Sequence, residues 1–111
     1  MEEITSGKLN IAYIGGDTAT IELLKTHDAF EVSDFGNSLL FINWLNNGNN
    51  PDGILCESYL PGTNGIEFHQ YLGKNNLASE VPFILVSRHE DEKIRKSAIS
   101  HKVDDLYLTP L

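Results

Sequence analysis

Side chains that could bind or react occur at four places in this sequence, each at or just after the end of an apolar run. One place is a Gly-Gly-Asp turn, one is a lone acid and two are hydroxyl residues: Gly15-Gly16-Asp17, Glu57, Ser87 and Thr109. Two glycines before a helix can cradle a phosphate with their backbone N–H groups. Carboxylates can bind hard cations such as Mg²⁺. These residue types therefore indicate a site for small ions, provided that the fold brings the four places together.

Simpler interpretations apply to the same residues. Gly15-Gly16 has no third glycine nearby, and such a pair more often marks an ordinary strand-to-helix turn. Asp17 more often caps the helix that follows, and the Ser87 hydroxyl can bond a neighbouring backbone group. The histidines are scattered without a metal-ligand spacing. Cys56 lies inside an apolar run, which is typical of a small core residue.

Apolar runs alternate with amphipathic stretches along the whole chain, and these elements must position the four places. Continuous apolar runs predict buried strands over 9–14, 29–33, 53–57, 81–86 and 106–108. Helical spacing predicts helices that begin after a cap at Asp17, after a cap at Ser38 and near Ile66, with a fourth over 89–101. The residues expected to face the core from the first three helices are Ala19, Ile21, Leu24, Leu39, Phe41, Ile42, Leu45, Ile66, Phe68, Tyr71 and Leu72.

This alternation predicts an α/β fold: a flavodoxin-like, doubly wound sheet of five parallel strands between two layers of helices. In open sheets of this kind the functional crevice lies beyond the carboxyl ends of the strands. We therefore expect Gly15, Glu57, Ser87 and Thr109 to share one crevice.

The composition narrows the classes of function. The chain has 111 residues, enough for one domain, and we expect a tail over 1–7 and a domain over 8–111. A formal net charge of −8 argues against a nucleic-acid partner and against an anionic membrane surface. A single cysteine cannot form an internal disulfide, and no segment resembles a signal peptide or a membrane span, so we expect a cytoplasmic protein.

Four segments together resemble the receiver domain of response regulators (CheY-like). Pro51 to Leu72, PDGILCESYLPGTNGIEFHQYL, resembles the segment around the family's phospho-accepting Asp. The opening KLNIAYIGGD resembles the first strand and its acidic loop, VPFILVSRHEDE the strand that ends in a switch hydroxyl, and VDDLYLTPL the last strand and its Lys-Pro loop. The resemblance covers nearly the whole chain from Lys8 onward and implies two-component phosphorelay signalling.

The sequence departs from the family pattern at the residues that carry the family's chemistry. Glu57 stands where the family has its acceptor Asp. The paired metal-binding acids, the lysine and the switch aromatic are also replaced, whereas the switch hydroxyl is kept; the corresponding positions are Gly15 and Gly16, Thr109, Leu106 and Ser87. The resemblance therefore implies a degenerate receiver that takes no phosphoryl group, binds Mg²⁺ weakly or not at all, has no cofactor and is not an enzyme.

The sequence is compatible with more than one role for Glu57 and more than one function for the chain. Glu57 is either a partial mimic of a phosphorylated Asp, with one negative charge instead of nearly two, or a carboxylate left after the site decayed. The chain could instead be a working receiver that uses Glu57, with Asp17 as a substitute metal ligand, or a small-molecule-binding domain that uses the same crevice. Tyr59 is the aromatic residue that we expect to contact a partner.

The resemblance also bears on partners. The family has a fifth helix after the Lys-Pro loop, and this sequence stops at Leu111. We expect a fragment of a longer regulator that is truncated before this helix. The expected partners are proteins: a kinase, an output domain, or a second copy bound through the uncovered sheet face.

Overall fold

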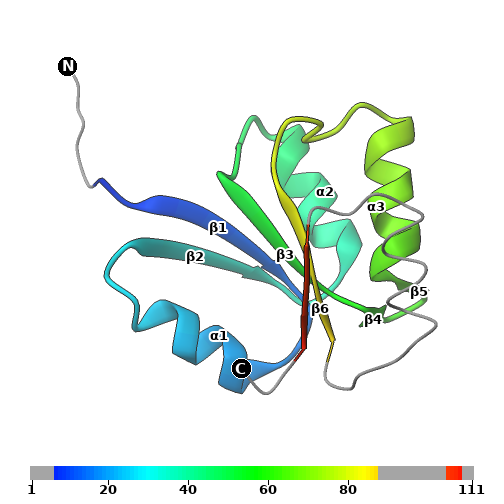
Figure 1. The fold of residues 1–111 in the computed structure, drawn as a ribbon. Coiled ribbons are helices and arrows are strands. Elements are labelled where there is room, and N and C mark those ends of the chain that lie inside the picture. Colours follow the sequence, from blue (N-terminus) through cyan, green and yellow to red (C-terminus); the bar gives the residue numbers. More distant parts are fainter. Residues whose placement is uncertain (1–6, 88–104, 109–111) are drawn as a thin grey trace.

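The computed structural model of the chain describes residues 7–87 and 105–108. Five strands form one sheet, in the order β2-β1-β3-β6-β7, and all neighbouring strands are parallel (Figure 1). The strands are β1 (Leu9–Ile14), β2 (Phe30–Phe35), β3 (Gly53–Glu57), β6 (Phe83–Ser87) and β7 (Asp105–Leu108). The chain passes outward from β1 to β2 and then returns to the other side of β1. The strand order therefore reverses between β1 and β3, which is where open α/β sheets form their crevices.

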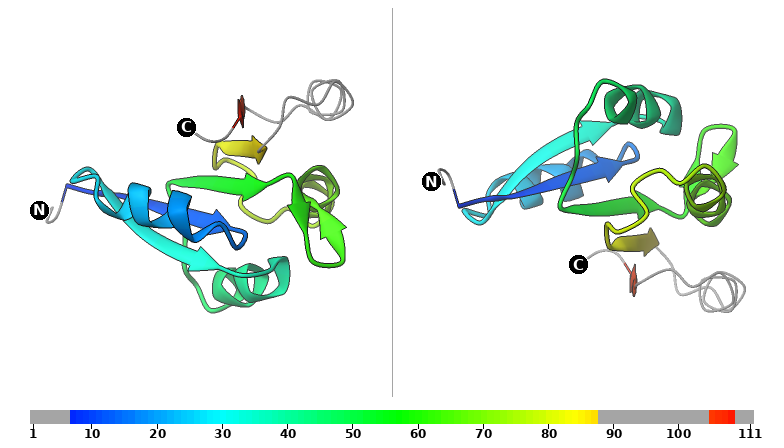
Figure 2. Two further views of the ribbon diagram at one scale, coloured as in Figure 1. Left: turned by 90° about the horizontal axis from the view of Figure 1, so that it is seen from below. Right: turned by 90° about the horizontal axis from the view of Figure 1, so that it is seen from above.

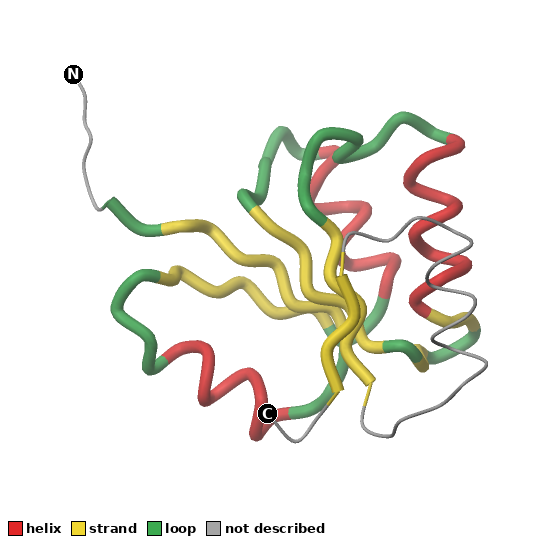
Figure 3. Tube along the Cα trace, viewed as in Figure 1, coloured by secondary structure: helices red, strands yellow, loops and turns green. Residues whose placement is uncertain are grey.

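In the part of the chain that the structure describes, three helices lie between the strands (Figure 3). They are α1 (Thr18–Lys25), α2 (Ser38–Asn46) and α3 (Gly65–Lys74). In each case the residue before the helix accepts a hydrogen bond from the backbone N–H three residues later, and these caps are Asp17, Asn37 and Asn64. The predicted cap at Asp17 is confirmed. The predicted cap at Ser38 is wrong by one position, because the side-chain oxygen of Asn37 bonds Leu40 N at 3.0 Å.

The helices cover both faces of the sheet, as the flavodoxin-like prediction requires. Figure 2 shows α1 on the opposite side of the sheet from α2 and α3. Phe41 from α2 and Phe68 and Leu72 from α3 pack on one face in the main core cluster, together with Ala12, Ile14, Ile54, Cys56, Leu60, Phe83 and Leu85. Ile21 of α1 is buried outside that cluster. The α/β three-layer architecture is thus confirmed.

Some local predictions were wrong. The second strand runs over Phe30–Phe35, so it begins and ends later than the predicted 29–33. The turn-rich segment after β3 contains a two-stranded antiparallel hairpin, β4 (Tyr59–Leu60) and β5 (Thr63–Asn64), where we expected a loop. Three residues predicted to face the core are exposed instead: Ala19, Leu39 and Tyr71.

Other predictions concern parts of the chain that are not described. The helix expected over 89–101, the tail over 1–6 and Thr109 lie outside the described residues. Among the helices that are described, none has the length and apolar character needed to cross a membrane.

Candidate functional site

The carboxyl ends of β1 and β3 lie side by side and define the crevice. Ile14 at the end of β1 pairs with Cys56 of β3, so Gly15 and Glu57 follow at the same level. On the other side of β3, Glu57 pairs with Val86, which places Ser87 one residue further along β6. The sheet register thus brings three of the four predicted places to one edge of the sheet.

The Glu57 side chain turns toward the loop between β1 and α1. Its Oε2 accepts hydrogen bonds from Tyr13 Oη at 2.6 Å and from the Asp17 backbone N–H at 2.9 Å, and its Oε1 accepts one from the Gly16 N–H at 3.2 Å. Hydrogen bonds to an ionised carboxylate are about twice as strong as neutral ones. Within the part of the chain that the structure describes, no Lys or Arg forms an ion pair with Glu57. The carboxylate is therefore held by three electrically neutral donors.

Gly15 leaves room for this carboxylate. A Cβ atom at this position would overlap the Cδ and Oε1 atoms of Glu57. The backbone φ of Gly15 is +144°, a conformation that residues with a Cβ atom rarely adopt. The Glu57 side chain can therefore occupy this position only because residue 15 has no side chain.

Tyr13 is a member of this site that the sequence did not reveal. Its side chain is completely buried, although it reaches the carboxylate with its hydroxyl. Burial, the hydrogen bond to Glu57 and the nearby charges of Glu57 and Asp17 all raise the pKa of the phenol far above its ordinary value. Tyr13 consequently stays protonated and acts as a donor. A tyrosine in the apolar part of a predicted buried strand was the available signal, because a buried phenol needs a hydrogen-bond partner.

Asp17 caps α1 with its side chain. Its Oδ1 accepts from Thr20 N at 3.4 Å and its Oδ2 accepts from Thr20 Oγ1 at 3.0 Å. Gly15 and Gly16 supply no side-chain oxygen. In the described ranges 7–87 and 105–108, no group of three His, Cys, Asp or Glu side chains is placed to hold a metal ion. The described residues thus do not supply the octahedral set of oxygen ligands that a magnesium ion prefers.

The segment after β3 forms the other wall of the crevice. Ser58 N donates to Val86 O at 2.8 Å, and Gly65 N donates to Ser58 O at 2.9 Å, so the segment is tied to β6 and folded back on itself. A Cβ atom at Gly65 would lie 2.6 Å from Glu57 O and 2.5 Å from a methyl group of Leu85. The start of α3 can therefore approach β3 this closely only with glycine at position 65.

Two further predicted residues lie on the hairpin and on the edge strand β7. Tyr59 is 68% exposed on the hairpin, where a partner could reach it. Leu106 lies on β7 next to Leu85 of β6, which places it one strand beyond β6. The roles assigned to Ser87, Leu106 and Thr109 stay predictions.

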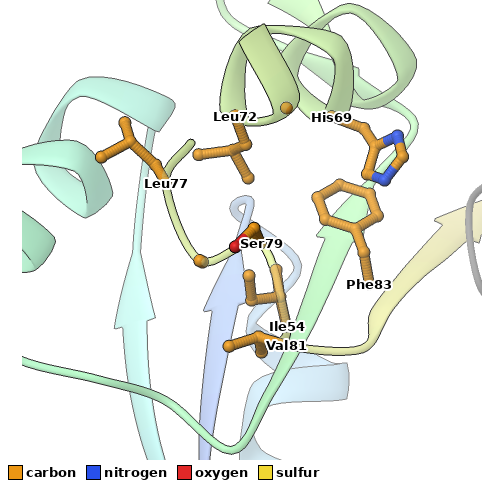
Figure 4. Close-up of a pocket in the computed structure, with 9 residues that line it drawn as sticks. Ile54, His69, Leu72, Leu77, Ser79, Val81 and Phe83 are labelled. Atoms are coloured by element: carbon orange, nitrogen blue, oxygen red, sulfur yellow. The ribbon is translucent and has the colours of Figure 1, made fainter. Parts of the chain in front are cut away.

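A second hollow lies at the other end of the sheet, away from Glu57 (Figure 4). It has a volume of about 210 Å³ and lies between α3 and the amino ends of β3 and β6. Its floor residues Ile54, Leu72 and Phe83 are between 0% and 4% exposed, and the His69 ring leans on Phe83 with 4.7 Å between centroids. The hollow is thus a shallow gap over packed side chains, separate from the crevice.

Comparison with known proteins identifies the class of this fold and crevice. The model of the family described as response regulator receiver domain matches residues 18–109. The cyclic di-GMP phosphodiesterase response regulator RpfG of Xanthomonas campestris pv. campestris (strain 8004) is 32% identical over 81 residues, which are 73% of this chain and 21% of that protein. The chain thus spans about a fifth of the length of this curated relative.

Solved structures agree with this family. A two-component response regulator from Cytophaga hutchinsonii matches with a TM-score of 0.79 at 23% identity, covering 94% of this chain and 88% of that one. The phosphorylated cyanobacterial phytochrome response regulator RcpA matches with a TM-score of 0.79 at 18% identity, covering 91% and 80%. The chain belongs to the response regulator receiver domain family and is a domain of two-component signalling.

Proposed function

We propose that this chain is a pseudo-receiver: it regulates protein partners from the receiver fold without accepting a phosphoryl group. The observation that carries the proposal is the position of the Glu57 carboxylate. It is held by Tyr13, Gly16 and Asp17, and it fills the space that a side chain at position 15 would take. The crevice thus contains a fixed carboxylate from the chain itself in place of metal-binding acids.

The geometry disfavours phosphoryl transfer for two reasons. A nucleophilic carboxylate must present a free oxygen in line with phosphorus, and both oxygens of Glu57 already accept hydrogen bonds. Negative charge on the moving oxygens must also be neutralised, and the three donors around Glu57 carry no positive charge. Either deficiency alone would slow the reaction by orders of magnitude.

The same geometry supports a structural role for Glu57 over phosphoryl mimicry. A mimic would extend its charge into the open crevice, whereas Glu57 bends back onto the loop between β1 and α1. We propose that Glu57 replaces a bound metal as the group that connects this loop to β3.

The partners in this proposal are proteins. The relative RpfG is about five times as long as the stretch it shares with this chain, and its name combines a response regulator with a phosphodiesterase. We propose that the present domain likewise controls an output domain or an associated protein, in the cytoplasm, and that it performs no catalysis itself. The acidic charge of −8 favours partners with basic surfaces over nucleic acid or anionic membranes.

The test is intact-mass spectrometry after incubation with acetyl phosphate and Mg²⁺. We expect no phosphoryl adduct on the unmodified chain, and none on Glu57→Asp, because the metal ligands and the lysine would still be missing. A variant with Glu57→Asp, Gly15→Asp, Gly16→Asp and Thr109→Lys is the positive control for the lost site.

The structure adds a condition to that control. Gly15→Asp requires a shorter residue at 57, because a Cβ at position 15 overlaps the Glu57 side chain. A variant with the other three changes but with Glu57 retained should therefore stay unphosphorylated. An adduct on the unmodified chain, at Glu57 or elsewhere in the crevice, would overturn the proposal in favour of a working receiver.

A further inference from the structure

We propose that Tyr13 Oη and the backbone N–H groups of Gly16 and Asp17 form a carboxylate-binding site whose resident ligand is the side chain of Glu57. This inference extends the proposed function, because it names the chemistry that the altered crevice now recognises. The site selects a planar carboxylate that carries one negative charge, and it excludes a phosphoryl group.

The donors match a carboxylate in number and position. Two of them, Tyr13 Oη and Asp17 N, bond one oxygen at 2.6 and 2.9 Å, and the third, Gly16 N, bonds the other oxygen at 3.2 Å. Both oxygens of a planar group are thus engaged. Because Tyr13 is completely buried, its hydroxyl cannot turn to solvent, and it donates to Glu57 Oε2.

The space around the carboxylate is an independent observation. The atoms of Glu57 that enter the site are Cγ, Cδ and the two Oε atoms, and Gly15 is open on the side where they lie. Any side chain at position 15 would fill the same volume. The site is therefore shaped for a group of about this size, delivered from the direction of β3.

The charges explain why a carboxylate suits the site better than phosphate. All three donors are neutral, and the Asp17 carboxylate lies close enough to Tyr13 to raise its pKa. A phosphoryl group carries nearly two negative charges at neutral pH, and the three neutral donors supply no positive charge to balance the second one. A monoanion lacks this second charge and keeps the three hydrogen bonds.

In the unmodified chain the carboxylate of Glu57 already occupies this site. Small external carboxylates should bind only when Glu57 is removed. Glu57→Ala deletes four heavy atoms, and these four atoms correspond to those of an acetate ion. Acetate is therefore the matched probe, and acetamide is the neutral probe of the same shape. Inorganic phosphate, a mixture of monoanion and dianion at pH 7, is the tetrahedral probe with the higher mean charge.

The experiment measures thermal unfolding of the unmodified chain and of Glu57→Ala in sodium acetate, acetamide, phosphate and sodium chloride, at pH 7 and constant ionic strength. We expect the midpoint of Glu57→Ala to fall by about 5–10 °C in chloride, because charge-assisted hydrogen bonds are lost. Acetate should recover several degrees of this loss in a saturable way. Acetamide and phosphate should recover little, and the unmodified chain should respond to none of the probes.

Amide NMR gives a local readout, and its use on Glu57→Gln keeps the test decisive if Glu57→Ala folds poorly. Acetate should move the Gly16 and Asp17 amide resonances of Glu57→Ala, and Tyr13→Phe added to that variant should weaken the effect several-fold. Glu57→Gln, which keeps the volume and loses the charge, should fold and show displaced Gly16 and Asp17 resonances.

The outcomes separate this inference from the proposed function, because the experiment contains neither Mg²⁺ nor a phosphoryl donor. Equal acetate responses in Glu57→Ala and the unmodified chain, or unmoved Gly16 and Asp17 amides in Glu57→Gln, would overturn the carboxylate site. A phosphoryl adduct in the mass experiment would overturn the proposed function and leave the carboxylate result to stand by itself.

Discussion

Two glycines lie on opposite sides of Glu57, and they are required for different reasons. Gly15, which follows β1, leaves space for the side chain of Glu57. Gly65, at the start of α3, leaves space for the backbone carbonyl of Glu57 and for a methyl group of Leu85. A side chain can be changed by mutation, whereas the backbone of a central strand cannot. The wall at Gly65 is thus fixed by the fold, and the wall at Gly15 depends on the residue at position 57.

The two walls also differ in how closely their residues match the receiver pattern. The segment from Ser58 to Gly65 keeps the Pro-Gly and Asn-Gly residues of the receiver pattern, because it sets how α3 packs on β3 and β6. In the loop between β1 and α1, Gly15 and Gly16 occupy the positions that we assign to the two acids of that pattern. In this loop Glu57 supplies the connection to β3 through Gly16 and Asp17.

The largest effect is expected for Gly65→Ala. The new Cβ would meet Glu57 O, which belongs to the backbone of a central strand, and a methyl group of the buried Leu85, so the free energy of unfolding should fall by about 3–5 kcal/mol. Urea denaturation measures this, and Gly73→Ala is the matched control, because it lies in the same helix with open space around it and should be neutral or slightly stabilising. The loss should be the same in the Glu57→Ala background; a difference would contradict the backbone explanation.

Gly15→Ala should cost less and should depend on position 57. In the unmodified chain the new methyl group displaces Glu57 from its three donors and also strains a backbone with φ of +144°, for a loss of about 2–3 kcal/mol. In the Glu57→Ala background only the backbone strain remains, so the loss should shrink by about 1–2 kcal/mol. Additive losses in this double-mutant cycle would show that Gly15 does not make room for Glu57.

Tyr13→Phe should have the smallest effect at neutral pH, a loss of about 1–2 kcal/mol for one hydrogen bond to a carboxylate. Its pH dependence is more distinctive. Because folding raises the pKa of the Tyr13 phenol above its ordinary value of 10.0, the contribution of Tyr13 to stability is complete below pH 10 and is lost as the pH rises further. Stability of the unmodified chain should therefore decline above pH 10 more steeply than that of Tyr13→Phe.

Two features isolate the tyrosine in this comparison. Burial also raises the pKa of the Cys56 thiol, and its alkaline contribution is common to both proteins, so it cancels in the difference. Tyr71→Phe removes an exposed phenol, 45% accessible, and should keep the pH profile of the unmodified chain. Parallel profiles for Tyr13→Phe and the unmodified chain would refute the proposed role of the buried hydroxyl.

Much of the fold follows from local patterns in the sequence. Continuous apolar runs identified the strands because parallel strands are covered on both faces. Asp17 was recognised as a cap because only a short polar side chain satisfies the first N–H groups of a helix. The same rule failed at α2, where Asn37 and Ser38 are adjacent and either residue type can cap. Leu39 was misplaced because the apolar residues of α2 cover most of its circumference.

The site was less accessible to sequence reasoning than the fold. The alteration of the family pattern at Glu57, Gly15 and Gly16 stays a prediction from the sequence. The hydrogen bond from Tyr13 to Glu57 could not be predicted, because it joins residues 44 apart in the chain. It depends on the register of β1 against β3 and on the direction in which one side chain turns. Neither quantity is encoded in spacing or composition. The mutual dependence of Gly15 and Glu57 likewise appears only when the empty volume at Gly15 is seen next to the carboxylate.

The central claim is that the crevice already contains its own anion, and amide NMR of the unmodified chain titrated with Mg²⁺ tests it most directly. If the Glu57 carboxylate is held by Tyr13, Gly16 and Asp17, millimolar Mg²⁺ should leave the Gly16 and Asp17 resonances in place, with or without acetyl phosphate. Glu57→Gln without added ions should displace the same two resonances. Saturable movement of the Gly16 and Asp17 amides with Mg²⁺ in the unmodified chain would contradict the account, because it would mean that Glu57 leaves these donors to bind a metal.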